Sequence, residues 1–259
     1  MLLTESYRTE RRLMEMSDFL REDLGTVVRY SPLSQNVEGL VCFANIPHQL
    51  LDEEIQRHIA HFDGMNIGFE WKVYDSDEPA CLRDKLIEAG FQEGEAESLM
   101  VYDTSEHRPA VVSELGGIMV RRIEHTNELN EVVDLQETIW DRSFSWLFDQ
   151  LLSIWNHGTF YGAYDNERLV GAGWIEYPPG AQFAELHGGS VLPAFRGRGI
   201  YSQLLHKRLS DALVKGVRWV AVDAAPMSRP ILEAKGLKKL DTTYPMAWLP
   251  RGTTVSHER

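Results

Sequence analysis

The segment Val191–Leu209 combines glycines, arginines and a following helix in the pattern of an anion-binding loop. Its sequence, VLPAFRGRGIYSQLLHKRL, runs from an apolar strand through a loop into an amphipathic helix. The first turn of a helix presents unpaired N–H groups and the positive end of the helix dipole, so it attracts anions. Gly197 and Gly199 let a phosphate approach the backbone, because no Cβ stands in the way. Arg196 and Arg198 add charge and forked donors, so the segment predicts a diphosphate-binding loop.

The charge around this loop supports the prediction. Residues 185–218 hold six basic and two acidic residues, in a chain whose formal charge is −13. The loop has neither the GxxxxGK(S/T) pattern of P-loop proteins nor the GxGxxG pattern of dinucleotide-binding domains. The alternative is a glycine-rich surface turn with solvated arginines. The strand–loop–helix context favours the anion site over that alternative.

The stretch RGRGIY, with Pro193 before it and an amphipathic helix after it, resembles the acyl-CoA pyrophosphate loop of the GNAT superfamily of N-acetyltransferases. That loop is written (Q/R)-x-x-G-x-(G/A). Arg196 and Gly199 match it, and Tyr201 stands where it has a small residue. The predicted elements from residue 118 to residue 250 also follow the order of the superfamily. The resemblance implies an α/β fold with a mixed sheet, and a complete GNAT copy in this part of the chain.

The resemblance also implies acetyl-CoA as the cosubstrate and no metal. It implies that the strands over 183–192 and 218–224 splay apart, and that the pantetheine lies in the wedge between them. Its backbone partners there would be Val191 and Leu192. The cofactor-binding residues implied in this way are Val191, Leu192, Arg196, Gly197, Arg198, Gly199, Ile200, Tyr201 and Ser228. An alternative role for Ser228 is to cap the helix that follows it.

Glu185 and His187 lie two residues apart on the strand that leads to the loop. Direct acyl transfer needs a neutral amine, so a base or a water relay must take a proton. Alternation along a strand puts both side chains on one face, and Glu185 resembles the strand carboxylate that is the base in some relatives. The alternatives are a solvent-facing glutamate and a half-buried, hydrogen-bonded histidine. The neighbouring pair Gly188-Gly189 predicts a β-bulge or the close approach of a ligand.

The acid that protonates the leaving thiolate is harder to place. Many relatives carry a tyrosine four residues before the glycine of the last helix, and counting back from Gly236 gives Leu232. Tyr244 in the final strand or Tyr201 could take over this role, or solvent could suffice. The candidate catalytic residues are Glu185, His187 and Tyr244.

Trp140, Trp146 and Trp155 lie on the predicted helices over the substrate side of this fold. They either pack in the core or line an aromatic acceptor pocket. Cys42 and Cys81 have no base partner in the sequence, so we expect buried apolar residues. Two cysteines are too few for a disulfide framework, which favours a reducing compartment.

Hydrophobic periodicity predicts elements along the whole chain. We expect the first 23 residues to form one amphipathic helix, followed by a region of mixed pattern. Strands are expected over 41–44, 68–74, 98–102, 118–123, 159–164, 169–177, 181–191, 218–222 and 244–249. Helices are expected over 51–62, 81–89, 127–156, 199–215 and 230–235.

Two stretches of the sequence resemble each other: FEWKVYDSDEPACLRDKLIEAGFQE over 69–93 and VRWVAVDAAPMSRPILEAKGLKKL over 217–240. In each, a strand with a tryptophan ends in aspartate, and a short helix ends in glycine. A proline precedes the tryptophan by 24 residues in the first copy and by 26 in the second. The pattern predicts an internal duplication, with a degenerate GNAT-like domain over 1–110 and a catalytic GNAT domain over 111–259.

The N-terminal copy lacks the loop. Where the C-terminal copy reads PAFRGRG from Pro193, the N-terminal copy reads PHQLLDEE from Pro47, with acids where phosphates would bind. Residues 1–110 hold 22 acidic and 10 basic residues, whereas residues 111–259 hold 17 and 16. We therefore expect one CoA site, and an acidic N-terminal half that attracts or covers a cationic acceptor.

Length and composition narrow the class of protein. The chain has 259 residues, 43 % of them hydrophobic, which is enough to bury a core. No apolar run approaches the ~18 residues of a membrane span, and the charged start does not resemble a signal peptide. The acidic balance argues against nucleic acid as a partner. We expect a cytoplasmic protein without membrane or nucleic-acid partners, either a monomer or a homodimer.

The function predicted from the sequence is transfer of an acetyl group from acetyl-CoA to a primary amine, directly and in a ternary complex. The amine is carried by a small molecule or a peptide. The alternative is a non-catalytic sensor or interaction module that binds acyl-CoA. The leucine at position 232 keeps this alternative open.

Overall fold

The computed structural model describes residues 2–16, 18–34, 37–109 and 116–250, and divides the chain into two compact units. The N-terminal unit holds the chain up to Leu99, Asp223–Met227 and the chain from Leu240 onward. The C-terminal unit holds Met100–Val222 and Ser228–Lys239. Two segments expected in the C-terminal domain thus group with the N-terminal unit. The boundary predicted at residue 110 lies outside the described residues.

The N-terminal unit is a sheet with helices on it. Its strands are β1 (Phe19–Asp23), β2 (Val27–Pro32), β3 (Gly39–Ala44), β4 (Phe69–Tyr74) and β5 (Gln92–Glu93). Its helices are α1 (Leu3–Leu13), the 3-10 turn η1 (His48–Leu50), α2 (Leu51–Met65) and α3 (Leu82–Glu88). Three strands have residues in both units: β6 (Glu97–Asp103), β11 (Trp219–Ala224) and β12 (Lys238–Trp248). The strand order is β1-β2-β3-β4-β12, and β5 pairs with β12.

Helices cover both faces of this sheet, because successive strand residues point to opposite sides. Val41 of β3 packs in one cluster with Phe62 of α2 and Trp71 of β4. Cys42, the next residue, lies on the side of α1, where its thiol donates to the carbonyl of Arg11. Cys42 is buried, and burial raises the pKa of its thiol to about 11. Cys81 is half-buried, and both cysteines are free thiols.

The C-terminal unit contains the region of the predicted loop. Its strands are β7 (Ile118–Arg122), β8 (Gly158–Asp165), β9 (Arg168–Glu176) and β10 (Phe183–Val191). Its helices are η2 (Thr126–Glu128), α4 (Leu129–Trp140), α5 (Leu147–Ser153), η3 (Pro193–Phe195), α6 (Ile200–Val214) and α7 (Arg229–Ala234). The strand order is β6-β11-β10-β9-β8-β7, with β7 to β10 antiparallel and β10 parallel to β11.

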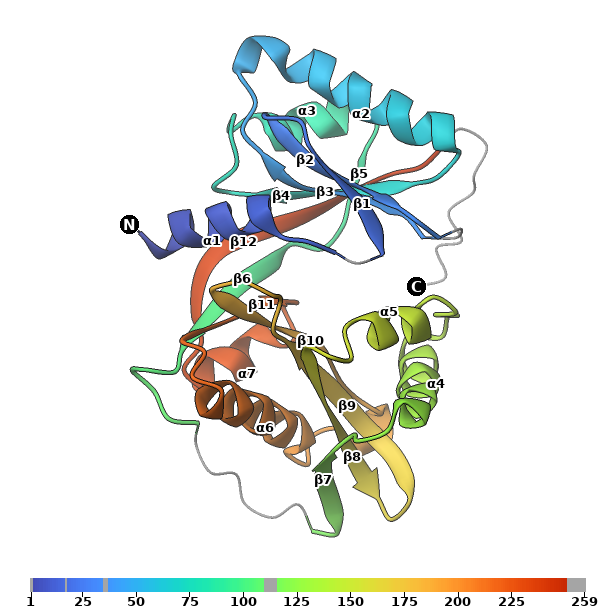
Figure 1. Ribbon diagram of the computed structural model, residues 1–259, viewed down its shortest axis with the longest axis vertical. Helices are drawn as coiled ribbons and strands as arrows, with labels where there is room; N and C mark the ends of the chain where they lie inside the picture. The colour runs from blue at the N-terminus through green and yellow to red at the C-terminus, as the bar shows by residue number, and fades with distance from the viewer. Residues whose placement is uncertain (1, 17, 35–36, 110–115, 251–259) are drawn as a thin grey trace. The chain divides into compact units, whose positions relative to one another are not determined.

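In this unit α4 and α5 lie on one side of strands β8 to β10, and α6 and α7 lie on the other (Figure 1). The parallel ladder joins Phe183–Glu185 to Trp219–Ala221. From Leu186 to Val191, the described pairings of β10 are with β9 alone. The ladder between β10 and β11 therefore stops before the loop, in agreement with the splay that the family resemblance implied.

The two units repeat one order of elements. The series β3, η1, α2, β4 and α3 in the first unit matches the series β10, η3, α6, β11 and α7. Pro47 and Pro193 stand at the start of the two 3-10 turns. In both units the strand before the turn is parallel to the strand after the long helix. The topology agrees with the internal duplication predicted from the sequence.

The expectation of one helix over the first 23 residues is wrong. α1 ends at Leu13, and Phe19–Asp23 forms β1, which pairs with β2. Leu13 and Leu20, which a continuous helix would put on one apolar face, are 64 % and 56 % exposed. Asp23 accepts a hydrogen bond from the N–H of Gly25, whose φ is +86°. This turn makes a hairpin, so pairing with a neighbouring strand overrides the helical spacing.

His58 of α2 makes the stability of the fold depend on pH. The side chain is fully buried against Trp71, and burial, with smaller contributions from positive charges such as Arg29, lowers its pKa from 6.5 to about 3. The folded chain holds His58 neutral, while the unfolded chain protonates it below pH 6.5. Between these two pKa values the contribution of His58 to the free energy of unfolding falls by about 1.4 kcal/mol per unit as pH drops.

Urea unfolding measured from pH 7 to pH 4 tests this. The free energy of unfolding of His58→Gln is expected to fall less steeply with pH than that of the unaltered chain. His48→Gln, at an exposed position in η1, is the matched control. Equal slopes for His58→Gln and the unaltered chain would contradict the prediction.

Candidate active site

Two glycines shape the loop before α6. Gly197 and Gly199 have φ of +74° and +84°, which favours glycine over any residue with a Cβ. Gly199 directly precedes α6, whose first turn holds no acidic residue and, within the described chain, has no side-chain cap. The N–H groups of this turn are therefore open to an anion. Their role in binding a diphosphate stays a prediction.

The two loop arginines are tied to the loop backbone. Arg196 donates from Nε to the carbonyl of Val191 at 3.1 Å, and Arg198 donates from Nη2 to the carbonyl of Ala194 at 3.3 Å. The Arg198 guanidinium also lies over the ring of Phe195, 4.9 Å from its centroid. Neither arginine forms an ion pair with a residue that the structure describes. Both keep unused donors and an uncompensated charge beside the first turn of α6.

The side chains of Val191, Leu192 and Ile200 are buried in the core of the unit. These residues could therefore meet a cofactor only through their backbone. The N–H of Leu192 donates to the carbonyl of Val170 at 2.9 Å, and its carbonyl accepts from Phe195 at 2.9 Å. A carbonyl has two lone pairs, so that of Leu192 retains one for a ligand.

A β-bulge interrupts β10 just before the loop. The register with β9 shifts between His187 and Ser190, which confirms the bulge predicted from the two adjacent glycines. Gly188 has a φ of +59°, and a Cβ there would lie 1.8 Å from the ring of Trp174. From α4, Gln136 donates to the carbonyl of Gly188 at 3.2 Å and to Oγ of Ser190 at 2.8 Å. The bulge is thus held by a side chain and requires glycine.

Glu185 and His187 lie on one face of β10, with Nε2 of His187 3.7 Å from Oε2 of Glu185. Glu176 of β9 stands opposite Glu185 in the register, and its Oε2 is 3.6 Å from the same nitrogen. Its other oxygen is 3.3 Å from Nε2 of His157. The sequence reasoning missed Glu176 and His157, because only strand pairing brings them here. These carboxylates and imidazoles lie close enough together to share a proton taken from an amine, and we call these four residues the His–Glu chain.

Tyr201 and Ser228, both expected to bind the cofactor, contact each other. The hydroxyl of Tyr201, in the first turn of α6, is hydrogen-bonded to Ser228, which directly precedes α7. Ser228 makes no side-chain cap bond to α7 in the described structure, so the capping alternative is not observed. Burial raises the pKa of Tyr201, and Arg208 and the bond with Ser228 offset part of that rise.

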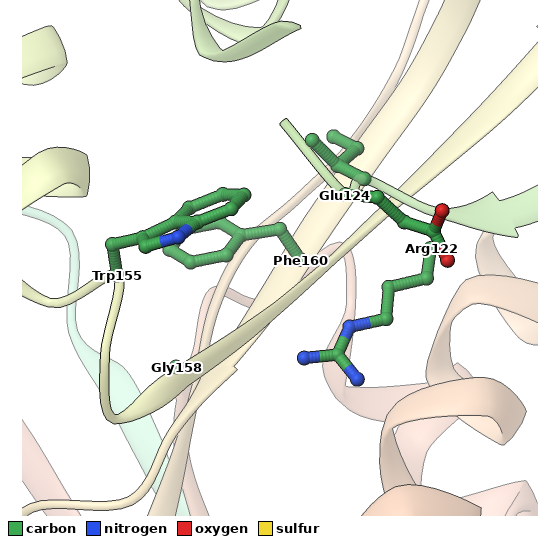
Figure 2. A pocket seen from close by; sticks show the side chains of 6 residues that line it. Arg122, Glu124, Trp155, Gly158 and Phe160 are labelled. Carbon is green, nitrogen blue, oxygen red and sulfur yellow. The ribbon is translucent and has the colours of Figure 1, made fainter. Parts of the chain in front are cut away.

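A pocket of about 320 Å³ opens beside the ends of β7 and β8. The residues that line it are Arg122, Ile123, Glu124, Trp155, Gly158 and Phe160. Figure 2 shows the rings of Trp155 and Phe160 on one side of this pocket and the side chains of Arg122 and Glu124 on the other. Neither of these two charges forms an ion pair with another described residue. The pocket can therefore hold a group that is partly apolar and partly charged.

Stacked rings lead from this pocket to the His–Glu chain. The ring centroids of Trp155 and Phe160 are 5.3 Å apart, and those of Phe160 and Trp174 are 6.2 Å apart. Trp174 stacks in turn on His187 at 6.4 Å. The pocket residue Gly158 also pairs with Glu176. Trp155 therefore packs against the core of the unit and also lines this pocket, while an acceptor in the pocket stays a prediction.

Trp140 and Trp146 have neither of the two predicted roles. They are 58 % and 38 % exposed, and neither lines the pocket beside Trp155. Nε1 of Trp140 donates to Oε1 of Gln136 at 3.1 Å, so it braces the side chain that holds the bulge.

Tyr244 lies in the N-terminal unit, opposite Val73 in the register between β12 and β4. The guanidinium of Arg83 covers its ring at 4.1 Å, and burial and Asp75 raise the pKa of its hydroxyl. The structure brings Glu185 and His187 together in the C-terminal unit, whereas Tyr244 belongs to the other unit. Its catalytic role stays a prediction. Leu232, at the position where relatives carry a tyrosine, is buried.

Part of this arrangement matches a known family model. Residues 127–227, from η2 through the loop to the segment after β11, match the family model of the Acetyltransferase (GNAT) family. The chain carries a GNAT domain. The match includes the glycine–arginine loop, β10 with its bulge, and α6. Members of this family use acyl-CoA, so the GNAT domain supports acyl transfer as the general activity.

Solved structures with the GNAT fold resemble nearly the whole chain. A GCN5-related N-acetyltransferase from Kribbella flavida has a TM-score of 0.73 at 10 % identity, over 98 % of this chain and 96 % of that chain. A tandem GNAT protein from the clavulanic acid biosynthesis pathway has a TM-score of 0.64 at 11 % identity, over 97 % and 96 %. A conserved protein of unknown function from Staphylococcus epidermidis has a TM-score of 0.64 at 18 % identity, over 90 % and 95 %.

At these identities the likeness shows the fold alone, which is the GNAT fold. No curated protein matches the chain. Among the described residues, no group of three or more His, Cys, Asp or Glu side chains is arranged to hold a metal ion. None of the helices described here is long and apolar enough to cross a bilayer.

Gly188→Ala is expected to destabilise the GNAT domain more than Gly180→Ala. Both glycines have positive φ, so each substitution adds backbone strain of about 1–2 kcal/mol. A Cβ at Gly180 meets nothing within 4 Å, whereas one at Gly188 meets the ring of Trp174. Displacing a packed ring lowers the free energy of unfolding by about 2 kcal/mol more. The urea midpoint of Gly188→Ala should therefore lie below that of Gly180→Ala. Equal midpoints for the two variants would show that the bulge does not need a glycine.

Proposed function

We propose that this chain transfers an acetyl group from acetyl-CoA to a primary amine, directly and in a ternary complex. The observation that carries the proposal is the arrangement on β10, which presents Glu185 and His187 just before the loop of a GNAT domain. Gly188 lies three residues before Val191, so at most about 11 Å of chain separates them. A pantetheine arm that starts at the loop and follows β10 backwards therefore brings its thioester to the bulge.

The proposed reaction forms a C–N bond and breaks a C–S bond. An amine reacts only when its lone pair is free, so its ammonium proton passes first to the His–Glu chain, with Glu185 as the base. The nitrogen then attacks the thioester carbonyl and loses one further proton to solvent as the intermediate collapses to the amide, and CoA departs as a thiolate that must gain a proton. Cys42 is buried, and burial raises the pKa of its thiol to about 11, so this thiol is a poor nucleophile. Its state favours a direct transfer over an intermediate acylated at Cys42.

The pocket beside Trp155 and Phe160 supports the choice of acceptor. Its aromatic wall fits a small molecule or peptide side chain with an apolar body, because aromatic rings bury large apolar areas. The stacked series from Trp155 to His187 links the pocket to the His–Glu chain. An acceptor held at the wall could extend its amino group toward the base.

An acyl-CoA sensor without turnover is the second candidate. It is favoured by Leu232, which puts a buried alkyl group where relatives of the fold have an acid. A sensor needs the loop but neither the His–Glu chain nor an acid. Both candidate functions therefore require binding of acyl-CoA, and only the transferase releases CoA thiol.

The double variant Arg196→Gln/Arg198→Gln is expected to bind acetyl-CoA about 10- to 100-fold more weakly. Each removed guanidinium takes away a charged donor beside the first turn of α6, and such bonds are worth about 1.5–3 kcal/mol. Isothermal titration gives the affinity. Raising the salt concentration should weaken the binding of acetyl-CoA to the unaltered chain more than its binding to the variant. Arg168→Gln, an exposed arginine at the start of β9, is the control. Equal affinity of the double variant and the control would exclude the loop as the phosphate site.

Release of CoA thiol from acetyl-CoA with a panel of primary amines tests the transfer itself. Glu185→Gln is expected to lower kcat about 100-fold with binding of acetyl-CoA retained, because the variant can no longer accept the ammonium proton. Glu167→Gln, an exposed glutamate in the turn between β8 and β9, is the control and should keep full activity. Binding without thiol release from any amine would favour the sensor. Full activity of Glu185→Gln would remove Glu185 as the base.

A further inference from the structure

Arg208 is a charged residue at a core position. It lies on the buried face of α6 and is 2 % exposed. Among the described residues no carboxylate forms an ion pair with it, and Tyr201 is the one group whose charge affects it. Burial lowers the pKa of its guanidinium to about 10, so it remains protonated at neutral pH. The C-terminal unit therefore holds an uncompensated positive charge.

The donors of Arg208 point at the bulge in β10. Nη1 donates to the carbonyl of His187 at 3.2 Å and to that of Trp174 at 3.4 Å, and Nε donates to the carbonyl of Leu204 at 3.1 Å. His187 and Trp174 are partners in the register at the edge of the bulge. Arg208 therefore donates to two carbonyls at the edge of the bulge, where the ladder between β9 and β10 is interrupted. Nη2 has no acceptor in the part of the chain that is described.

Two glycines make room for this guanidinium. A Cβ at Gly173 would lie 2.9 Å from Cζ of Arg208, and one at Gly189 would lie 3.2 Å from Nη2. The same Cβ at Gly189 would lie 3.0 Å from the ring of Tyr201. The free end of Arg208 and the ring of Tyr201 therefore meet at one position of β10. Ser228 holds the hydroxyl of that ring.

Packing alone does not account for Arg208. A buried charge without a counter-ion costs stability, and an apolar side chain of similar volume fills a core at a lower cost. The bonds to the carbonyls offset part of that cost, but they do not use the charge. An uncompensated cation in a dry site acts on negative charge that arrives or forms there.

The negative charge that forms in the proposed reaction is the CoA thiolate, so this inference rests on the proposed function. A pantetheine that follows β10 back from the loop passes Gly189, where Nη2 of Arg208 and the ring of Tyr201 meet. We propose that Tyr201 donates its hydroxyl proton to the departing thiolate, and that Arg208 assists by stabilising the phenolate that forms on Tyr201 as the proton leaves. Arg208 is a positioning residue in this scheme, and Tyr201 is the catalytic acid.

The step balances without a further reactant. The C–S bond breaks and its electron pair stays on sulfur, the O–H proton of Tyr201 moves to that sulfur, and free CoA thiol results. The phenolate left on Tyr201 lies beside the Arg208 guanidinium and accepts a hydrogen bond from Ser228. It regains a proton from solvent before the next turnover.

A double-mutant cycle on kcat tests the pair, with thiol release as the assay. Tyr201→Phe removes the hydroxyl and keeps the ring, and we expect kcat to fall about 100-fold. Arg208→Met keeps most of the volume and removes the charge, and we expect a fall of about 10- to 100-fold. The double variant should be no slower than Tyr201→Phe alone, because Arg208 acts through Tyr201. KM for acetyl-CoA should stay within about twofold in all three.

Two further variants separate charge from structure. Arg208→Lys keeps the positive charge but loses the planar fork, so it should recover part of the kcat lost in Arg208→Met. Lys207→Met, one residue earlier on α6 and without a described partner, removes an equal charge and should keep full activity. Thermal melts and binding of CoA show whether each variant is folded. If Arg208→Met does not fold, Arg208→Lys and Tyr201→Phe carry the cycle.

Each outcome decides the inference. If the losses of kcat in the two single variants multiply in the double variant, or if KM rises without a fall in kcat, Arg208 only supports the fold. Either result would overturn the inference. Full activity of Tyr201→Phe would overturn it as well. In both cases the unaltered chain still acetylates amines, so the proposed function stands. An unaltered chain that binds acetyl-CoA and acetylates no amine would remove the proposed function together with this inference.

Discussion

The bulge in β10 is the feature on which the rest of the site depends. A regular strand would continue its ladder with β9, but the register shifts between His187 and Ser190, and side chains donate to backbone carbonyls at this place. Gln136 supplies one donor from α4, and Arg208 supplies another from α6. The two helices that cover the strand are thus tied to one irregularity. The bulge also separates the two tasks of β10, since Glu185 lies before it and the loop begins after it.

The two units share a topology but differ in the few residues at the start of their long helix, and these residues determine whether that helix can bind an anion. Both units lead from a strand through a 3-10 turn into a helix of 15 residues. In the C-terminal unit that helix starts after Gly199, with arginines nearby and no acid in the first turn. In the N-terminal unit the first turn holds Asp52, Glu53 and Glu54. Carboxylates at the positive end of a helix stabilise it, but they repel a phosphate. The same backbone can therefore be either a helix start that attracts anions or one that repels them.

Local patterns predicted the parts of the site that local physics fixes. The glycines and arginines of the loop, the shared face of Glu185 and His187, and the bulge all follow from neighbouring residues. Glu176 entered the site through strand pairing, which the sequence of β9 alone does not determine. β1 was misread as helix for the same reason, because its partner β2 fixes its conformation.

Arg208 escaped sequence reasoning for a different reason. An arginine in an amphipathic helix is normally assigned to the solvent-facing side, since burying a charge is costly. Only the glycines at 173 and 189, on two neighbouring strands, make space for it. The space for Arg208 depends on α6, β9 and β10 together, so the sequence of one element alone does not reveal it.

Tyr201 and Leu232 together reverse the side-chain sizes that relatives have at these two positions, which argues that the two positions are linked. The loop pattern of relatives has a small residue at this position and a tyrosine four residues before the last helix glycine; this chain has Tyr201 and Leu232. Leu232 is buried on α7, while Tyr201 on α6 bonds to Ser228 at the start of α7. A ring on α6 thus stands beside α7, the helix that carries the tyrosine in relatives. The ring can approach β10 there because position 189 is glycine, whose missing Cβ leaves room for both the phenol and the guanidinium. Tyr201, Arg208 and Gly189 are therefore best understood as one arrangement, in which each residue makes sense only with the other two.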